Sequence, residues 1–142
     1  MFQLPFPVSD ANARSGNKDL GNLPEWDLSD LYTSEDAPEI KRDLEWLEKA
    51  CASFAADFEG KLAGLDAAGL LDCVLRNEKI NQIAGRIMSF AGLRYYQLTT
   101  DAGRAKFMSD CQEKITNFTT PLVFFTLELN RLEDDHLDGL FA

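Results

Sequence analysis

Several residue types that particular folds and sites require are scarce in this 142-residue sequence. Val and Ile total 8 residues, whereas Leu and Ala total 35, so helix formers far outnumber the β-branched residues that favour strands. His136 is the single histidine, which excludes a metal site that needs two imidazoles from this chain. The composition therefore predicts an all-α fold and argues against an all-β one.

Basic side chains and long apolar runs are also in short supply. The chain has 14 Lys and Arg residues and 24 Asp and Glu residues. The resulting net charge of −10 disfavours binding to nucleic acid or to an anionic membrane. The longest apolar stretch, residues 121–129, is far shorter than a membrane span of roughly 20 residues. Residues 1–8 lack the regions of a signal peptide, and the three cysteines lack metal or redox spacing. We expect a soluble, cytoplasmic protein with no nucleic-acid or membrane partner.

The chain divides into a polar leader and a helical lobe. Residues 1–22 hold few large apolar groups, and we expect them to form a mobile leader. Residues 23–142 are expected to form the lobe, which opens with a short, apolar-rich anchor segment, residues 23–32, that docks on the helices after it. About three long helices follow, and their apolar seams predict an elongated antiparallel bundle.

Apolar periodicity and start signals indicate the first two helices. Pro38 suits the first turn of a helix, and the acidic and hydroxyl groups of residues 34–36 are placed to cap it. Asp66 is expected to cap the second helix, on which Gly85 and Gly92 favour the close approach of a neighbouring helix. The seam of the first helix comprises Ile40, Leu44, Leu47, Cys51, Phe54 and Phe58.

The third helix carries the most regular seam and is expected to run for about 32 residues, or ~48 Å. Thr99, Thr100 or Asp101 is expected to cap it, and Pro121 is expected to bend it. Its seam comprises Met108, Cys111, Ile115, Phe118, Leu122, Phe125, Leu129 and Leu132.

Three apolar side chains of this helix, Val123, Phe124 and Leu127, fall outside the seam. A helix that is hydrophobic over much of its circumference normally lies inside a larger core. We therefore expect these three residues to pack against another domain, and we interpret the chain as a truncated part of a longer protein.

No complete catalytic constellation is visible in the sequence. The H-E-x-x-H, G-x-S-x-G, P-loop and dinucleotide glycine patterns are all missing. Asp134, Asp135 and His136 could ligate a metal, but charges at a helix start explain them more simply. The cysteines lie on or beside apolar seams, where packing is commoner than reactivity. We expect no catalytic residue, metal ligand or cofactor in these residues.

Arg94, Tyr95 and Tyr96 form the one cluster that places a cation beside two phenols, at the end of the predicted second helix. They are candidates for contact with a peptide. The alternative is aromatic packing beside an arginine whose stem lies along apolar surface, which is the commoner arrangement.

The anchor segment carries a recognisable motif, whose residues are Leu23, Pro24, Trp26, Asp27, Leu28, Leu31 and Tyr32. Together with the acidic helix that ends near residues 58–62, it resembles the N-terminal region of oligoendopeptidase F, in the thimet-oligopeptidase-like zinc metallopeptidase family. The resemblance continues through residues 95–101 and 124–129 and so covers about residues 23–142.

This resemblance implies a longer, almost wholly helical metalloprotease that hydrolyses short peptides in a deep channel. Its zinc would be held in a catalytic domain absent from this chain, by an H-E-x-x-H helix and a further glutamate. The present residues would form a helical lobe that walls the channel. That lobe would be inactive alone and would meet oligopeptide substrates only in the full-length enzyme.

An autonomous acidic interaction module is the alternative interpretation. The seams of the first and third helices would serve equally well for packing against a partner or a second copy of the chain. In that case the isolated chain would associate with itself. A self-contained hydrolase is disfavoured because no nucleophile–base pair is visible.

Overall fold

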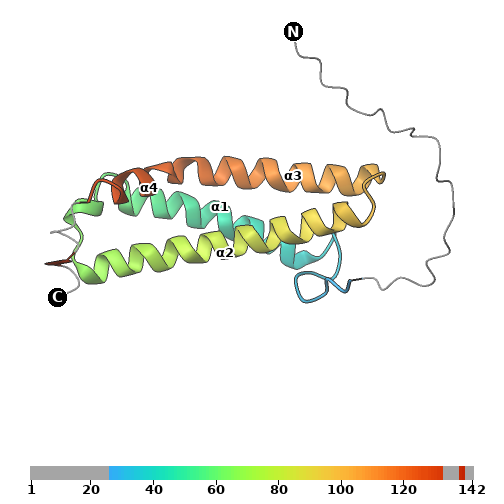
Figure 1. Ribbon diagram of the computed structural model, residues 1–142, viewed down its shortest axis with the longest axis horizontal. Helices are drawn as coiled ribbons and strands as arrows, with labels where there is room; N and C mark the ends of the chain where they lie inside the picture. The colour runs from blue at the N-terminus through green and yellow to red at the C-terminus, as the bar shows by residue number, and fades with distance from the viewer. Residues whose placement is uncertain (1–25, 133–137, 140–142) are drawn as a thin grey trace, which may run out of the picture.

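The computed structural model describes residues 26–132, 138 and 139, and these contain no β-strand. Three long helices dominate: α1 (Pro38–Phe58), α2 (Ala67–Gln97) and α3 (Ala102–Thr119). A 3₁₀ turn, η1 (Leu62–Gly64), lies between α1 and α2. Consecutive helices run side by side in opposite directions, as Figure 1 shows. The all-α fold and the elongated antiparallel bundle are confirmed.

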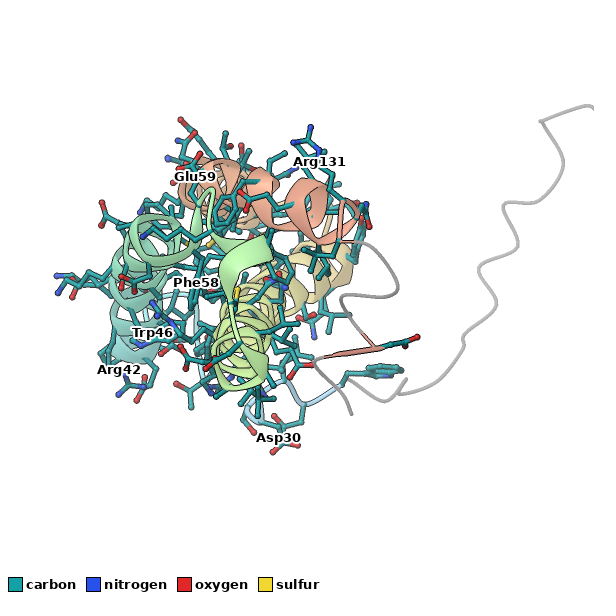
Figure 2. All side chains as sticks on the ribbon, turned by 90° about the vertical axis from the view of Figure 1, so that its left-hand side faces the viewer. Asp30, Arg42, Trp46, Phe58, Glu59 and Arg131 are labelled. Carbon is teal, nitrogen blue, oxygen red and sulfur yellow. The ribbon has the colours of Figure 1, made fainter. Side chains whose placement is uncertain are left out.

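The core follows the seams that the sequence predicts. Leu47 and Phe54 of α1 are fully buried, and so is Ile87 of α2, while Cys111 and Ile115 supply the buried positions of α3. Viewed end-on, the helices surround this core, and charged side chains such as Arg42 and Asp30 point outward (Figure 2). The remaining buried apolar side chains of the core include Tyr32, Ile40, Cys51, Phe58, Leu62, Cys73, Ile80, Phe90 and Phe124.

Aspartate caps begin two of the helices: Asp66 caps α2 as predicted, and Asp101 is the one of the three candidates that caps α3. Asp66 Oδ1 accepts a hydrogen bond from the N–H of Gly69 at 2.8 Å. Asp101 Oδ1 accepts from the N–H groups of Gly103 and Arg104 at 2.8 and 3.0 Å, which lowers the pKa of this carboxyl. Each carboxylate satisfies amides that a helix start leaves without intrahelical partners.

The start of α1 differs from the expectation that residues 34–36 cap this helix. Its N-cap residue is Ala37, which has no side-chain hydrogen bond, and residues 34–36 do not cap the helix. Pro38 does occupy the first turn, as predicted, and the fixed φ of proline preorganises that turn without a polar cap. At the other end, Gly60 takes a left-handed φ of 75° just after the helix, a conformation that glycine adopts without strain.

The third helix is not continuous, contrary to the expectation of about 32 residues. α3 ends at Thr119, a 3₁₀ turn η2 (Thr120–Leu122) follows, and the chain resumes as the seven-residue helix α4 (Val123–Leu129). Pro121 supplies no N–H to the backbone ladder. The hydroxyls of Thr119 and Thr120 also donate to the carbonyls of residues 115 and 116, at 2.8 and 2.7 Å. Such bonds loosen a helix, so the break combines two local causes.

No neighbouring helix of the described chain approaches closely at Gly85 or Gly92 of α2, so the expectation that these glycines allow close helix packing is wrong. A Cβ atom at Gly85 would meet nothing within 4 Å, and one at Gly92 would meet only the Tyr96 ring of the same helix, at 3.9 Å. The expected leader, residues 1–22, and the acidic segment around His136 lie outside the described residues.

Candidate functional site

The described part of the family-like motif forms one tight turn. The carbonyl of Leu28 accepts hydrogen bonds from the N–H groups of Leu31 and Tyr32, at 2.9 and 3.2 Å. Asp27 Oδ1 accepts from the N–H of Ser29 at 2.9 Å, and this hydrogen bond lowers the pKa of the carboxyl. The motif therefore has a locally determined shape. Leu23 and Pro24 lie outside the described residues.

Tyr32 is the side chain that anchors this turn to the bundle. It is buried, and its ring meets the Phe90 ring of α2 edge-on, with centroids 5.4 Å apart. Leu28 and Leu31 pack against the core while remaining partly exposed. Trp26 is 76% exposed, so the expectation that it docks with the others is wrong. It precedes the turn, beside the last residue of α2, where the described part of the chain offers no further helix to cover it.

A polar cluster that is buried at Tyr32 and Asp43 and partly exposed at Arg86 joins the motif to α1 and α2. Tyr32 Oη donates to Oδ2 of Asp43, a buried residue of α1, at 2.7 Å. Arg86 of α2 places its guanidinium carbon 4.4 Å from the centre of the Tyr32 ring and Nη1 3.8 Å from Asp43 Oδ2. Its Nη2 also donates to the Leu31 carbonyl. Burial, and then the hydrogen bond to Asp43, raise the pKa of Tyr32 above its ordinary range. The cluster fixes the position of the motif.

Arg94 belongs to a second polar cluster, in the last turn of α2. Its Nε donates to Glu35 Oε1 at 2.8 Å, and this bond lowers the pKa of the Glu35 carboxyl. Its Nη1 donates to Gln97 at 3.0 Å, while Arg104 of α3 donates to the carbonyl of Arg94 at 3.2 Å. Arg94 lines a depression of about 780 Å³ between the motif turn and the ends of α2 and α3.

The structure does not bring Arg94, Tyr95 and Tyr96 together as one peptide-contact site. Consecutive helical residues point about 100° apart, so Arg94 faces the motif while Tyr96 lies 68% exposed on another side of α2. The Tyr95 and Tyr96 rings contact each other, with centroids 5.3 Å apart. Tyr96 is absent from the depression that Arg94 lines.

The three candidates for interdomain packing separate into two groups. Val123 is 60% exposed and Leu127 is 53% exposed, on one side of α4. Phe124 is buried, and its ring stacks on Phe54 of α1 with centroids 5.8 Å apart. The interdomain role expected for Phe124 is therefore wrong, because the break at Pro121 turns that side chain into the core of its own bundle.

Glu128 holds α4 against the loop that follows α1. Its Oε1 accepts a hydrogen bond from the N–H of Gly60 at 2.6 Å, and its Oε2 accepts from the N–H of Leu62 at 3.2 Å. Both donors are backbone amides of residues that are separated from Glu128 by more than sixty positions. The exposed Val123 and Leu127 therefore stand on a helix with a fixed position.

Sequence reasoning missed a groove between α1 and α3, of about 780 Å³ and mainly apolar lining. Leu44 and Phe118 were expected at seam positions, and both line the groove while remaining partly exposed. Acidic residues flank these positions, among them Glu45 and Glu48 of α1. No signal in the sequence distinguishes Leu44 and Phe118 from the seam residues that are fully buried.

The cysteines and acidic residues offer no site for a metal in the described part of the chain. Cys51, Cys73 and Cys111 are all buried on separate helices, and burial raises the pKa of each thiol, that of Cys73 to about 11. No group of three or more His, Cys, Asp and Glu side chains is placed to hold an ion among residues 26–132. The zinc that the resemblance implies would lie in a catalytic domain outside this chain, so these residues do not test it.

No family model matches the sequence, and no curated protein or solved structure matches it either. Within the described part of the chain, no helix combines the length and apolar character that crossing a membrane requires.

Proposed function

We propose that this chain is the N-terminal helical lobe of an oligoendopeptidase F-like zinc metallopeptidase of the cytoplasm. The lobe walls the channel in which the enzyme hydrolyses short peptides, and it contributes neither a zinc ligand nor a catalytic residue. Zinc belongs to a catalytic domain outside these residues, and oligopeptide substrates meet the lobe only when that domain is present.

The observation that carries the proposal is the exposed apolar pair of α4. Val123 and Leu127 lie one helical turn apart and are 60% and 53% exposed, on a helix that Glu128 fixes to the α1–α2 loop. A preorganised apolar surface of this kind suits packing against another domain. The resemblance of the opening motif to the peptidase family is what supports a catalytic domain as the partner of this surface.

The first test uses the 142-residue chain and the gene that encodes it. The purified chain should contain no stoichiometric zinc and should not cleave a quenched fluorescent oligopeptide. The reading frame beyond codon 142 should encode an H-E-x-x-H motif. Stoichiometric zinc, robust peptide turnover by the chain alone, or a frame without that motif would each refute the proposal.

The second test targets the exposed pair in the protein expressed from the complete gene. A Val123→Asp/Leu127→Asp double variant should lower peptide hydrolysis by about tenfold or more, because it places charge in an apolar interface. Leu75→Asp is the matched control, since Leu75 is also 53% exposed but lies on α2. Equal activity in the double variant and the control would contradict the role of α4.

The exposed pair also favours a second candidate, an autonomous module that associates with itself through α4. Sedimentation of the 142-residue chain separates the two functions. A dimer that the Val123→Asp/Leu127→Asp variant dissociates would support the module, whereas a monomer at high protein concentration would remove it.

A further inference from the structure

Two backbone amides in the turn after α1 point at the same side chain. The N–H groups of Gly60 and Leu62 donate to Oε1 and Oε2 of Glu128, at 2.6 and 3.2 Å. The N–H of Lys61, between them, instead donates to the carbonyl of Phe58 at 3.0 Å. Converging amides of a turn that contains a residue with left-handed φ, here Gly60, form a concavity that binds anionic groups. The turn therefore presents two donors that fit one carboxylate.

The inner of the two amides needs an acceptor because it has little access to water. Leu62 is 1% exposed and belongs to the hydrophobic core. Its N–H would be left without a partner if the carboxylate of Glu128 moved away, and a buried donor without an acceptor is costly. One carboxylate satisfies both amides at once, and hydrogen bonds to a charged acceptor are stronger than those to a neutral one.

The charged side chains around the turn nearly cancel. Lys61 lies between the two donors, and Arg76 of α2 is paired with Asp57 at 2.8 Å and with Asp72 at 3.8 Å. Glu59 points into solvent at the end of the bundle (Figure 2), where salt screens its charge. The attraction for an anion therefore comes from the two amides, and the carboxylate already bound there shows that the surroundings accept a negative group.

The position of α4 depends on this contact. The helix is seven residues long and is separated from α3 by η2, and a helix of that length is not stable by itself in water. Its contacts with the core include the rings of Phe124 and Phe125, whose centroids lie 5.8 and 5.7 Å from that of Phe54. The order of α4 should therefore report whether the two amides are occupied.

We propose that the turn at residues 59–62 is a carboxylate-binding site and that Glu128 is its internal ligand. The amides of Gly60 and Leu62 each recognise one oxygen of the carboxylate, and α4 stays docked only while the site is filled. Glu128 is partly exposed, so a small carboxylate from solution can reach the site once this side chain is removed. The inference uses only contacts within this chain and does not rest on the proposed peptidase function.

The test removes the internal ligand and supplies a free one. In Glu128→Ala, amide hydrogen exchange in α4 should be faster than in wild type, and sodium acetate should slow it again relative to equal sodium chloride. The recovery should saturate, and it should reach about fourfold at an acetate concentration about three times the dissociation constant. The amide proton shifts of Gly60 and Leu62 should change in the same titration, because their hydrogen bonds form again.

Two proteins serve as controls for a general effect of acetate. In wild type the tethered carboxylate has a high effective concentration, so acetate should leave exchange in α4 unchanged. Glu113→Ala removes the same kind of side chain from an exposed position of α3 and should also show no response. Circular dichroism checks folding. If Glu128→Ala unfolds in chloride, refolding becomes the measurement, and acetate should restore the helical signal whereas chloride should not.

Three results would overturn the proposal. One is an equal effect of acetate and chloride on Glu128→Ala, because the site would then not recognise a carboxylate. Another is an equal response of Glu113→Ala, which would show that acetate stabilises the fold in general. The third is recovery of α4 while the amide shifts of Gly60 and Leu62 stay constant, because acetate would then act elsewhere.

Discussion

At the scale of single residues, the most connected side chain is Tyr32. Its ring packs on Phe90 and lies beneath the guanidinium of Arg86, while its hydroxyl donates to Asp43. A buried carboxylate needs such partners, because an unpaired one is costly to keep away from water. Tyr32 therefore contributes both apolar area and a hydrogen bond to the same carboxylate.

Replacing Tyr32 with phenylalanine removes only the hydroxyl. We expect Tyr32→Phe to lower the free energy of unfolding by about 1–3 kcal/mol, because Asp43 loses a buried donor. Tyr96→Phe, at a side chain that is 68% exposed, is the matched control and should change stability by less than about 0.5 kcal/mol. Urea denaturation measures both, and equal small effects would show that the hydroxyl does not support the fold.

The same variant has a second signature at alkaline pH. Burial raises the pKa of Tyr32 in the folded chain, so above about pH 10 the unfolded chain releases its proton first. The stability that this residue contributes should therefore decline as the pH rises beyond that value. In Tyr32→Phe this part of the decline should be missing, and denaturation at several alkaline pH values tests it.

At the scale of helices and turns, the sequence predicted what depends on neighbouring residues. The cap at Asp66 was predictable, and the cap at Asp101 was narrowed to three neighbouring residues, because a capping side chain bonds to amides only two or three positions away. The buried seam of α1 was predictable because apolar spacing alone defines a helix face. The irregularity at the end of α3 is larger than predicted. Pro121 indicated only a bend, but the helix is interrupted there, and the hydrogen bonds from the Thr119 and Thr120 hydroxyls contribute to the interruption.

The attachment of α4 was not predictable from the sequence. Glu128 reaches the amides of Gly60 and Leu62, and nothing near it in the sequence distinguishes it from an ordinary exposed glutamate. The pairing requires both the α1–α2 hairpin and the turn at η2 to be in place. Contacts of this kind depend on the tertiary arrangement, so the side of α4 that becomes buried was also assigned incorrectly at Phe124.

The role of Glu128 can be measured with an isosteric change. We expect Glu128→Gln to lower the free energy of unfolding by about 1 kcal/mol, because one carboxylate oxygen becomes an NH₂ group that faces an amide donor. Amide hydrogen exchange should also accelerate in α4 more than in α2. Glu113→Gln, at an exposed position of α3, is the control. Unchanged exchange in α4 would contradict the attachment.

At the scale of the whole molecule, several carboxylates make stability depend on pH. Hydrogen bonds from Arg94, Arg76 and backbone amides lower the pKa values of Glu35, Asp57 and Asp101, respectively. As the pH falls, the unfolded chain takes up protons at these groups before the folded chain does, so stability is lost.

We therefore expect the free energy of unfolding to be nearly constant around neutral pH and to decrease below about pH 5. Glu35→Gln removes one contributing carboxylate and should make the decrease shallower. Urea denaturation between neutral and acidic pH measures the slope for both proteins. An identical acid slope in wild type and Glu35→Gln would show that the Arg94 contact does not persist in solution.

Some features of the candidate surfaces could be predicted from the sequence and others could not, as for the fold. The seam correctly left out Val123 and Leu127, which are exposed, but it failed for Phe124, which lies outside the seam and is buried. The α1–α3 groove could not be predicted, because Leu44 and Phe118 have the spacing of ordinary core residues. Their partial exposure depends on the distance between two helices, and no pattern within either helix encodes that distance.

The Glu128 attachment places unequal constraints on the two segments that it joins. The loop contributes main-chain groups, which every amino acid except proline provides, so the side chain of Lys61 between the two donors can vary without loss of this contact. Position 128 has no such freedom, because both acceptors belong to one side chain. A library of random substitutions selected for folded protein should therefore tolerate fewer residues at position 128 than at position 61, where a change removes only the exposed hydrogen bonds from Lys61 Nζ to the carbonyls of Ala56 and Asp57.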